Sequence, residues 1–142
     1  LIDMGIEPFL VASSVEAVMG QRLVRTICPN CKEEQKVDRD YLRQINCPEH
    51  VLEEGRFYHG AGCEECRNQG YKGRLAIYEL LVMSEAIRPL ILNREASSVI
   101  GQVAVNEGMR TLRDDGWQKV MNGQTTIEEI LRVTMSDEHL KE

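Results

Sequence analysis

The sequence lacks the features of a membrane-spanning or secreted protein. None of its apolar runs approaches the roughly 20 residues that a helical membrane span requires. The first residues, Leu1-Ile2-Asp3, carry neither a basic segment nor the apolar core of a secretory signal, which favours a cytoplasmic location. Internal repeats and low-complexity segments are also missing. The 142 residues are enough for one ordinary domain or two small modules.

Motifs of catalysis are missing as well. The chain has no Gly-x-x-x-x-Gly-Lys-Ser/Thr phosphate loop and no apolar strand that ends in an acidic pair suited to magnesium. It has no Ser, Cys or His arranged as a nucleophile with its base. Its 17 basic and 23 acidic residues give a net charge of −6, which argues against broad binding to nucleic-acid phosphates. We therefore expect no catalysis by this chain alone and no nucleic-acid partner.

Two Cys-x-x-Cys pairs are the most informative feature that is present. Cys28 and Cys31 form the first pair, Cys63 and Cys66 form the second, and the pairs enclose residues 32–62. A Cys-x-x-Cys turn directs two sulfur atoms toward one ion, and four thiolates at about 2.3 Å suit a structural zinc ion with no open position. The spacing therefore predicts a four-cysteine zinc site.

Other uses of the cysteines stay open at this point. Disulfides need an oxidising compartment, and five cysteines, an odd number without a signal, disfavour them. A redox Cys-x-x-Cys normally stands alone in a thioredoxin-like fold, whereas iron could occupy the same four sulfur atoms. We interpret Cys47 as a buried or half-exposed thiol outside the site. His50 or His59, inside the enclosed segment, could replace one cysteine as a ligand.

A long helix is predicted over residues 8–25. Pro8 suits the first position of a helix, where its missing N–H costs nothing. Apolar residues recur at helical spacing along one face: Phe9, Leu10, Ala12, Val15, Val18, Met19 and Leu23. Arg22 and Arg25 then lie on a solvent-exposed face near the end of this helix, where they would favour its dipole.

The segment enclosed by the cysteines predicts short helices over 38–44 and 48–54, followed by a strand over 56–60. A second strand is predicted over 73–82. Two strands beside a metal site would make a small ribbon with too little core to fold by burial alone. The metal would then supply about 10 kcal/mol or more, as it does in zinc peptides.

From Ser84 onward the pattern is helical. We expect helices over 84–93 and 95–106, the second of which ends at Gly108. Capping boxes begin two more helices, at Thr111 with Asp114 and at Thr126 with Glu129. Trp117, Val120 and Met121 form the expected buried stripe of the first of these.

The tail after Thr134 is polar and is expected to fray. Taken together, the predicted elements indicate an α+β fold that is mainly helical, with a short β-ribbon at the zinc-binding subdomain and a helical module at the end of the chain.

Six motifs extend over nearly the whole chain. They occupy residues 1–10, 21–32, 62–66, 70–81, 108–112 and 123–134. In this order they resemble the C-terminal region of the ATPases that power type II secretion and type IV pilus assembly. The Pro-Phe-Leu run at 8–10 and the Glu-Leu-Leu run at 79–81 favour the type II branch.

The resemblance implies a cytoplasmic, hexameric ATPase that couples ATP hydrolysis to assembly of a pseudopilus or pilus. It places the phosphate loop, the acidic magnesium residues and a histidine-containing box upstream of Leu1, so ATP and magnesium would bind only the parent protein. The chain would then be a fragment from the end of a RecA-like ATPase domain. Cys28, Cys31, Cys63 and Cys66 match the tetracysteine metal-binding motif of the family, whereas Cys47 lies outside it. The resemblance puts Arg22 and Arg25 near a nucleotide or subunit interface without a catalytic role.

Three parts follow from the resemblance. Residues 1–27 would be the terminal helix of the truncated RecA-like domain, 28–72 the tetracysteine metal-binding subdomain, and 73–142 a strand with the C-terminal helical module. The implied partners are neighbouring ATPase subunits and inner-membrane platform proteins, through which the protein would be peripheral to the inner membrane. The alternatives are a pilus ATPase fragment, a free-standing zinc ribbon that binds proteins, and a dithiol redox protein.

Overall fold

The computed structural model describes residues 1–134, and within them it confirms an α+β fold. Four strands form two separate antiparallel ribbons in the described part of the chain. The long ribbon pairs β1 (Ala17–Ile27) with β4 (Tyr71–Val82), and the short one pairs β2 (Lys32–Gln35) with β3 (Phe57–Gly60). The polar tail expected after Thr134 lies outside the described residues.

The helix predicted over residues 8–25 is wrong beyond Ser14. Helix α1 covers only Pro8–Ser14, and Val15 already has an extended backbone. The rest of the predicted helix is strand β1, which pairs with β4 along almost its whole length, from Ala17 opposite Val82 to Ile27 opposite Tyr71. The β-branched residues of this segment suit a strand, and an available partner strand overrides a helical apolar spacing.

The expected ribbon also pairs differently. The two predicted strands exist as β3 and β4, but they do not pair with each other. Strand β3 pairs with β2, a strand that the sequence did not indicate, and β4 pairs with β1. Short charged strands such as Lys32–Gln35 carry no alternating apolar pattern, so only their partner reveals them.

The helices are otherwise close to expectation. Helices α2 (Arg39–Gln44) and α3 (Glu49–Glu54) fall within the segment between the cysteine pairs, and the side chain of Asp38 caps α2. Helices α4 (Ile87–Leu92) and α5 (Ser97–Asn106) follow β4. Helix α6 (Leu112–Met121) begins with the predicted capping box of Thr111 and Asp114, and α7 (Ile127–Thr134) follows it.

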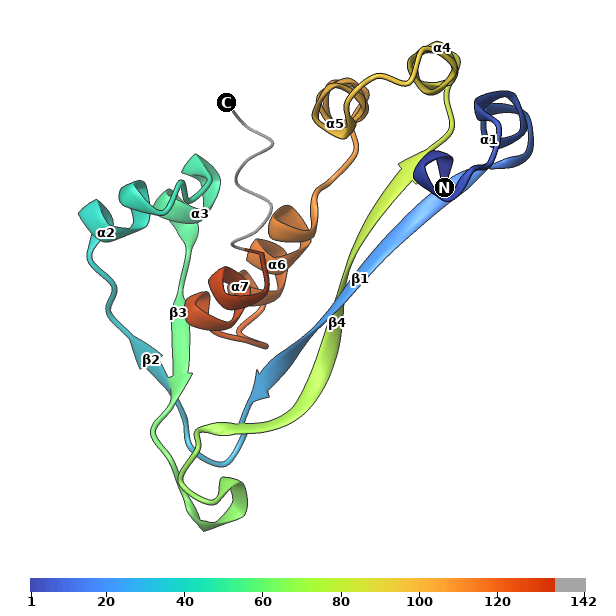
Figure 1. The fold of residues 1–142 in the computed structure, drawn as a ribbon. Helices are drawn as coiled ribbons and strands as arrows, with labels where there is room; N and C mark the ends of the chain where they lie inside the picture. Colours follow the sequence, from blue (N-terminus) through green and yellow to red (C-terminus); the bar gives the residue numbers. More distant parts are fainter. Residues whose placement is uncertain (135–142) are drawn as a thin grey trace.

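Two apolar cores lie at different places along the long ribbon. The main core lies between the two ribbons and is filled by α2, α3, α6 and α7 (Figure 1). Its buried side chains are Val24, Leu42, Cys47, Val51, Phe57, Ile77, Leu112, Trp117, Val120, Ile127 and Ile130.

The second core lies at the far end of the ribbon, where α1, α4 and α5 gather (Figure 1). It buries Val11, Ala12, Met83, Ile87, Ile91 and Ala104. The guanidinium group of Arg88 on α4 donates to the carbonyl of Ala12 on α1, which fixes the two helices to each other. The long ribbon therefore joins a helical lobe at one end to the cysteine-bearing loops at the other.

Candidate metal centre

The four cysteines of the two Cys-x-x-Cys pairs converge at the end of the ribbons opposite the helical lobe. The sulfur atoms of Cys28, Cys31, Cys63 and Cys66 all lie within 4.8 Å of one another. Cys28 and Cys66 are buried, and Cys31 and Cys63 are partly exposed. Residues far apart in the sequence therefore form one compact sulfur cluster.

The spacing of the sulfur atoms suits a tetrahedral ion. The Sγ atoms of Cys28 and Cys63 are 3.8 Å apart, those of Cys31 and Cys66 are 3.8 Å apart, and those of Cys63 and Cys66 are 3.7 Å apart. A tetrahedral centre with metal–sulfur bonds of about 2.3 Å separates its ligands by about 3.8 Å. A disulfide needs about 2.05 Å, and all five cysteines are free. The donor set and its dimensions therefore fit a four-coordinate thiophilic ion such as zinc.

Backbone contacts hold the two cysteine pairs together. The N–H of Ala61 donates to the carbonyl of Cys31, and the N–H of Cys28 donates to the carbonyl of Gly70, each at 2.9 Å. Gly60 and Gly70 meet backbone to backbone, because a Cβ added to Gly60 would lie well under 3.0 Å from the Gly70 carbonyl. Only glycine allows this approach.

Amide groups also point at the sulfur atoms. The N–H of Gly70 donates to Cys66 Sγ at 3.2 Å, and the N–H of Cys63 donates to the same atom at 3.3 Å. Cys31 Sγ accepts from the N–H of Gly62 at 3.3 Å. Gly62 has a φ of 96°, a left-handed conformation that aims this amide at the cluster. Such donors stabilise thiolates and orient them around an ion.

The thiols of the cluster differ in acidity. Burial opposes ionisation of Cys66, but the N–H donors of Cys63 and Gly70 outweigh it and lower the pKa of this thiol to about 6. Burial raises the pKa of Cys31 to about 12, and the neighbouring sulfur atoms add to the rise. The Cys66 thiolate thus forms readily, whereas the Cys31 thiolate is disfavoured unless a cation balances its charge.

Two lysines, Lys72 and Lys32, lie close to the cysteine pairs in the sequence. Lys72 pairs with Glu65, and this contact raises the pKa of Lys72, with smaller electrostatic contributions from Cys28 and Cys63. Lys32, which directly follows the first cysteine pair, lies instead over the ring of Tyr58, 4.4 Å from its centroid. Lys72 is therefore a cation near enough to the cluster to interact with its charge.

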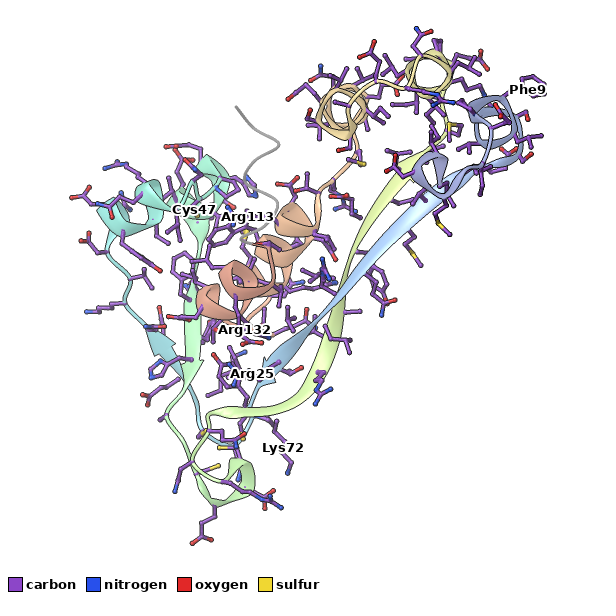
Figure 2. The ribbon with its side chains drawn as sticks, in the orientation of Figure 1. Phe9, Arg25, Cys47, Lys72, Arg113 and Arg132 are labelled. Atoms are coloured by element: carbon purple, nitrogen blue, oxygen red, sulfur yellow. The ribbon has the colours of Figure 1, made fainter. Side chains whose placement is uncertain are left out.

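The other candidate ligands lie elsewhere. Cys47 is packed in the main core near α2 and α3 (Figure 2), where burial raises the pKa of its thiol to about 11. The Nε2 atom of His59 lies 3.1 Å from a carboxylate oxygen of Glu33 on the neighbouring strand. Among residues 1–134, the one group of potential metal ligands with suitable spacing contains the four cysteines and neither His59 nor His50.

Sequence reasoning missed an ion-pair network between β1 and α7. Both carboxylate oxygens of Glu129 are occupied. Arg25 donates to them from its backbone N–H at 2.8 Å, its Nε at 2.9 Å and its Nη2 at 2.6 Å, and Arg132 donates from Nε and Nη2 at 2.9 Å each. The Glu129 side chain is only 1% exposed. Arg25, expected on an exposed helix, instead anchors α7 to the ribbon.

The capping box predicted at Thr126 is therefore formed in part. The Thr126 hydroxyl accepts from the N–H of Glu129 at 3.3 Å, as expected. The Glu129 carboxylate, however, turns to Arg25 and Arg132. The available signal was the spacing of Glu129 and Arg132, three apart on one helix, which favours a pair between them.

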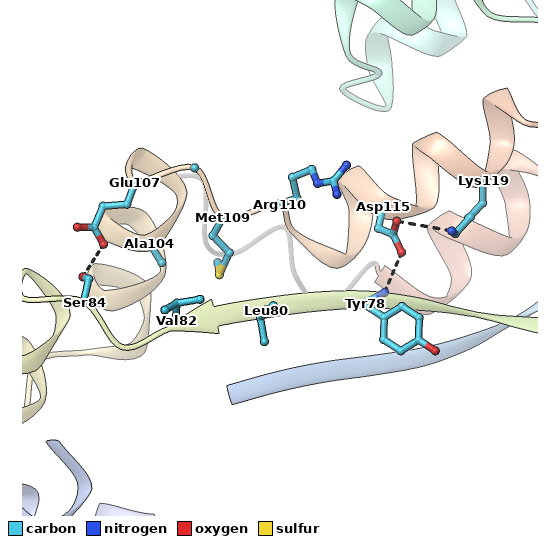
Figure 3. A pocket seen from close by; sticks show the side chains of 11 residues that line it. Tyr78, Leu80, Val82, Ser84, Ala104, Glu107, Met109, Arg110, Asp115 and Lys119 are labelled. Carbon is cyan, nitrogen blue, oxygen red and sulfur yellow. Dashed lines mark hydrogen bonds and ion pairs between the residues drawn. The ribbon is translucent and has the colours of Figure 1, made fainter. Parts of the chain in front are cut away.

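A groove of about 610 Å³ runs along β4, on the side that faces α5 and α6 (Figure 3). Its acidic groups are already bonded. Glu107 accepts from the hydroxyl of Ser84 at 2.6 Å, and Asp115 accepts from the N–H of Tyr78 at 2.9 Å. The described lining contains neither cysteine nor histidine, so the groove adds nothing to the metal centre.

Comparison with known proteins gives one consistent result. A family described as "Type II/IV secretion system protein" matches residues 1–132. A type IV pilus assembly ATPase PilB of Thermus thermophilus is 44% identical over 135 residues, which cover 95% of this chain and 15% of that protein.

Relatives from the other branch are similar to the same degree. A type II secretion system protein E of Pseudomonas aeruginosa is 42% identical over 137 residues, which cover 96% of this chain and 27% of the relative. A type II secretion system ATPase E of Vibrio cholerae is 41% identical over 134 residues, which cover 94% of this chain and 26% of that protein. The chain thus spans about a quarter or less of the length of these relatives.

Proposed function

Because the chain belongs to the type II/IV secretion system protein family, we propose that it is the C-terminal part of a hexameric ATPase that powers type II protein secretion. In this proposal Cys28, Cys31, Cys63 and Cys66 bind a structural zinc ion. The single observation that supports the zinc most directly is the geometry of the four sulfur atoms: all lie within 4.8 Å of one another, and three of the pairs are 3.7–3.8 Å apart, as in a tetrahedral thiolate site.

The proposed role of this region is mechanical. Zinc would hold the loops at the end of both ribbons as a rigid projection, and the parent ATPase would supply ATP and magnesium binding. We propose residues 1–27 as the end of the RecA-like domain, 28–72 as the metal-binding subdomain and 73–142 as the strand and helical module. Neighbouring subunits and an inner-membrane platform protein would be the partners, with the ATPase located in the cytoplasm at that membrane.

Three observations support this proposal. The family match and the relatives named as ATPases extend over almost the whole chain. The relatives are several times longer, which leaves room for the nucleotide-binding motifs in the parent protein. In the described part of the chain, none of the helices has the length and apolar character needed to cross a bilayer.

Native mass spectrometry of the purified chain, before and after acid denaturation, tests the zinc site. We expect one zinc ion per chain and five reduced thiols. Cys28→Ser removes a ligand that is fully buried, so zinc should fall to less than a tenth and residues 32–62 should become sensitive to protease. Cys47→Ser is the matched control, because it changes a buried thiol outside the cluster and should keep its zinc.

The outcomes separate the alternatives. A wild-type mass two or four daltons light, without metal, would support the dithiol redox protein. Bound iron would correct the identity of the metal. Full zinc content in Cys28→Ser would contradict the four-cysteine site.

The motor role needs the full-length protein in its host. There, Cys28→Ser should reduce secretion at least tenfold, whereas Cys47→Ser should leave secretion intact. Loss of surface pili with normal secretion would instead favour the pilus branch, which the similarity of both branches keeps as the second candidate. Loss of neither would favour a free-standing zinc ribbon.

A further inference from the structure

A cationic pocket lies on the long ribbon beside α7, and none of the four clustered cysteines lines it. It has a volume of about 510 Å³ and is lined by Leu23, Val24, Arg25, Arg74 and Arg132. The chain as a whole has a net charge of −6, whereas the lining of this pocket contains three arginines and no acidic residue. The pocket plays no part in the metal centre.

Two of these arginines are direct cross-strand partners. Arg25 on β1 lies opposite Arg74 on β4. The backbone N–H of Arg25 donates to Glu129 at 2.8 Å, so it points away from β4 and the pair is a non-hydrogen-bonded one. Partners of this kind lie about 4.5 Å apart at Cα, with both side chains on the same face. Like charges in this position destabilise a ribbon unless an anion lies between them.

Two of the three guanidinium groups are held in place before any ligand arrives. Glu129 fixes Arg25 and Arg132 through paired N–H···O contacts of 2.6–2.9 Å. The guanidinium group of Arg25 also lies 4.1 Å from the centroid of the Tyr71 ring. Figure 2 shows Arg25 on β1 and Arg132 on α7 next to each other at this place. Little side-chain entropy is therefore lost when they bind a ligand.

The fixed arginines keep donors for a ligand. Each guanidinium has five N–H groups, of which Glu129 engages those on Nε and Nη2. Arg25 and Arg132 remain 46% and 56% exposed at the side chain. Arg74 is exposed as well. Free N–H groups of three guanidinium groups can thus reach an anion in the pocket.

The charge of the cluster indicates which anion fits. Arg25 and Arg132 share the single carboxylate of Glu129, and Arg74 adds a third cation to the pocket lining, so these four side chains together carry two surplus positive charges. A phosphate group carries about −1.5 to −2 charges near pH 7 and offers at least three acceptor oxygens. A carboxylate would neutralise only half of the surplus positive charge. Phosphate matches that charge and has enough oxygen atoms to accept hydrogen bonds from all three guanidinium groups.

We propose that Arg25, Arg74 and Arg132 form a binding site for a phosphoryl group, carried either by free phosphate or by a phosphate ester. The site is independent of the zinc ion and of the secretion role. The pocket and the sulfur cluster share no residue, so either proposal can fail without the other.

A titration of the zinc-loaded chain with sodium phosphate, followed by ¹H–¹⁵N NMR at constant ionic strength, tests the site. We expect saturable shifts of the amides of Leu23, Val24, Arg25 and Arg74, with half-saturation at millimolar phosphate. Sodium chloride at the same ionic strength should not reproduce them. Arg74→Ala should weaken phosphate binding at least fivefold and keep its zinc, because the Arg74 side chain is exposed.

Two further variants control for charge and for folding. Arg74→Lys keeps the positive charge but loses the paired N–H donors of the guanidinium group, so it should bind phosphate with intermediate affinity. Arg110→Ala removes an exposed arginine from the groove along β4 and should bind phosphate as the wild type does. Equal shifts with chloride, or equal binding by Arg74→Ala and the wild type, would overturn the proposal.

Parallel titrations with pyrophosphate and with magnesium-free ADP distinguish the sources of the phosphoryl group. A Kd for ADP at least tenfold below that for pyrophosphate indicates a nucleotide. Equal Kd values, or tighter binding of pyrophosphate, indicate free phosphate or a polyphosphate. Each of these outcomes supports the phosphoryl site, and failure of all three phosphates to bind rejects it.

Discussion

Glu129 is the single residue whose environment differs most from what its place in the sequence suggests. The run Thr-Ile-Glu-Glu at the start of its helix predicts that Glu129 completes a capping box. In the folded chain its carboxylate is buried and accepts from Arg25 and Arg132, on two different elements. The pair with Arg25 joins positions about a hundred residues apart, which no local pattern encodes.

The acidity of Glu129 follows from these contacts. Burial raises the pKa of this carboxyl group, but the donors of Arg132 and Arg25 outweigh it and lower the pKa to about 2. A carboxyl group with a lowered folded-state pKa stabilises the protein above its unfolded pKa near 4.5. This contribution disappears as the pH falls from about 4.5 toward 2.

Glu129→Gln should therefore destabilise the chain at pH 7 by roughly 3 kcal/mol, since each pKa unit corresponds to about 1.4 kcal/mol. Both proteins are measured with EDTA throughout, because acid releases zinc from thiolates. The difference from the wild type should shrink as the pH falls below 4.5. Urea unfolding of both proteins between pH 7 and 3 measures it. Glu65→Gln is the control, because its pair with Lys72 is more than half exposed on both sides and should contribute little to stability. A pH-independent difference for Glu129→Gln would contradict this account.

At the scale of elements, β1 and the glycine contact at the metal centre decide the fold. The apolar spacing of residues 8–25 indicated one helix, yet the chain turns at Val15 into a strand that pairs with β4. The contact of Gly60 with Gly70 then brings the end of β3 against the start of β4, next to the cysteines. Pairing partners and backbone contacts thus determine elements that periodicity misassigned.

Gly60→Ala should destabilise the chain by about 3 kcal/mol or more and weaken zinc retention, because its methyl group would overlap the Gly70 backbone. Gly101→Ala, inside helix α5, meets nothing within 4 Å and should stabilise slightly, by up to about 1 kcal/mol. Thermal unfolding of both variants and competition with a zinc chelator give the two measurements. Tolerance of alanine at residue 60 would show that the approach is less close than described.

At the scale of the whole molecule, the described residues place two apolar cores and the cysteine cluster at different positions along the fold. The helical lobe has its own buried side chains at one end of the long ribbon, and the cysteines lie at the other end (Figure 1). The short ribbon between the cysteine pairs has only four residues in each strand. The effect of removing metal should therefore depend on position along the molecule.

Chelation of the metal should loosen β2, β3 and the cysteine loops while the helical lobe keeps its protection. Hydrogen exchange followed by mass spectrometry, with and without EDTA, measures this. We expect exchange of residues 28–72 to rise at least tenfold and that of α4 and the second core to change less than twofold. A uniform rise along the chain would instead mean that the metal stabilises the molecule as one cooperative unit.

The sequence by itself predicted the α+β class, the secretion ATPase family, most helices and the four cysteines of the candidate metal site. These features depend on local spacing, capping residues and short motifs, whose residues lie close together in the sequence. The helix at α6 shows this well, because Thr111 and Asp114 lie within a single turn.

Only the tertiary structure decided the remaining features. Strand β1 depends on its partner β4, strand β2 on β3, and the network of Glu129 on an arginine of a different element. The pocket of Arg25, Arg74 and Arg132 likewise requires the register of the long ribbon and the packing of α7 against it. The physical reason is the same in each case. The stabilising partner lies far away in the sequence, so the two residues interact only when the chain has folded.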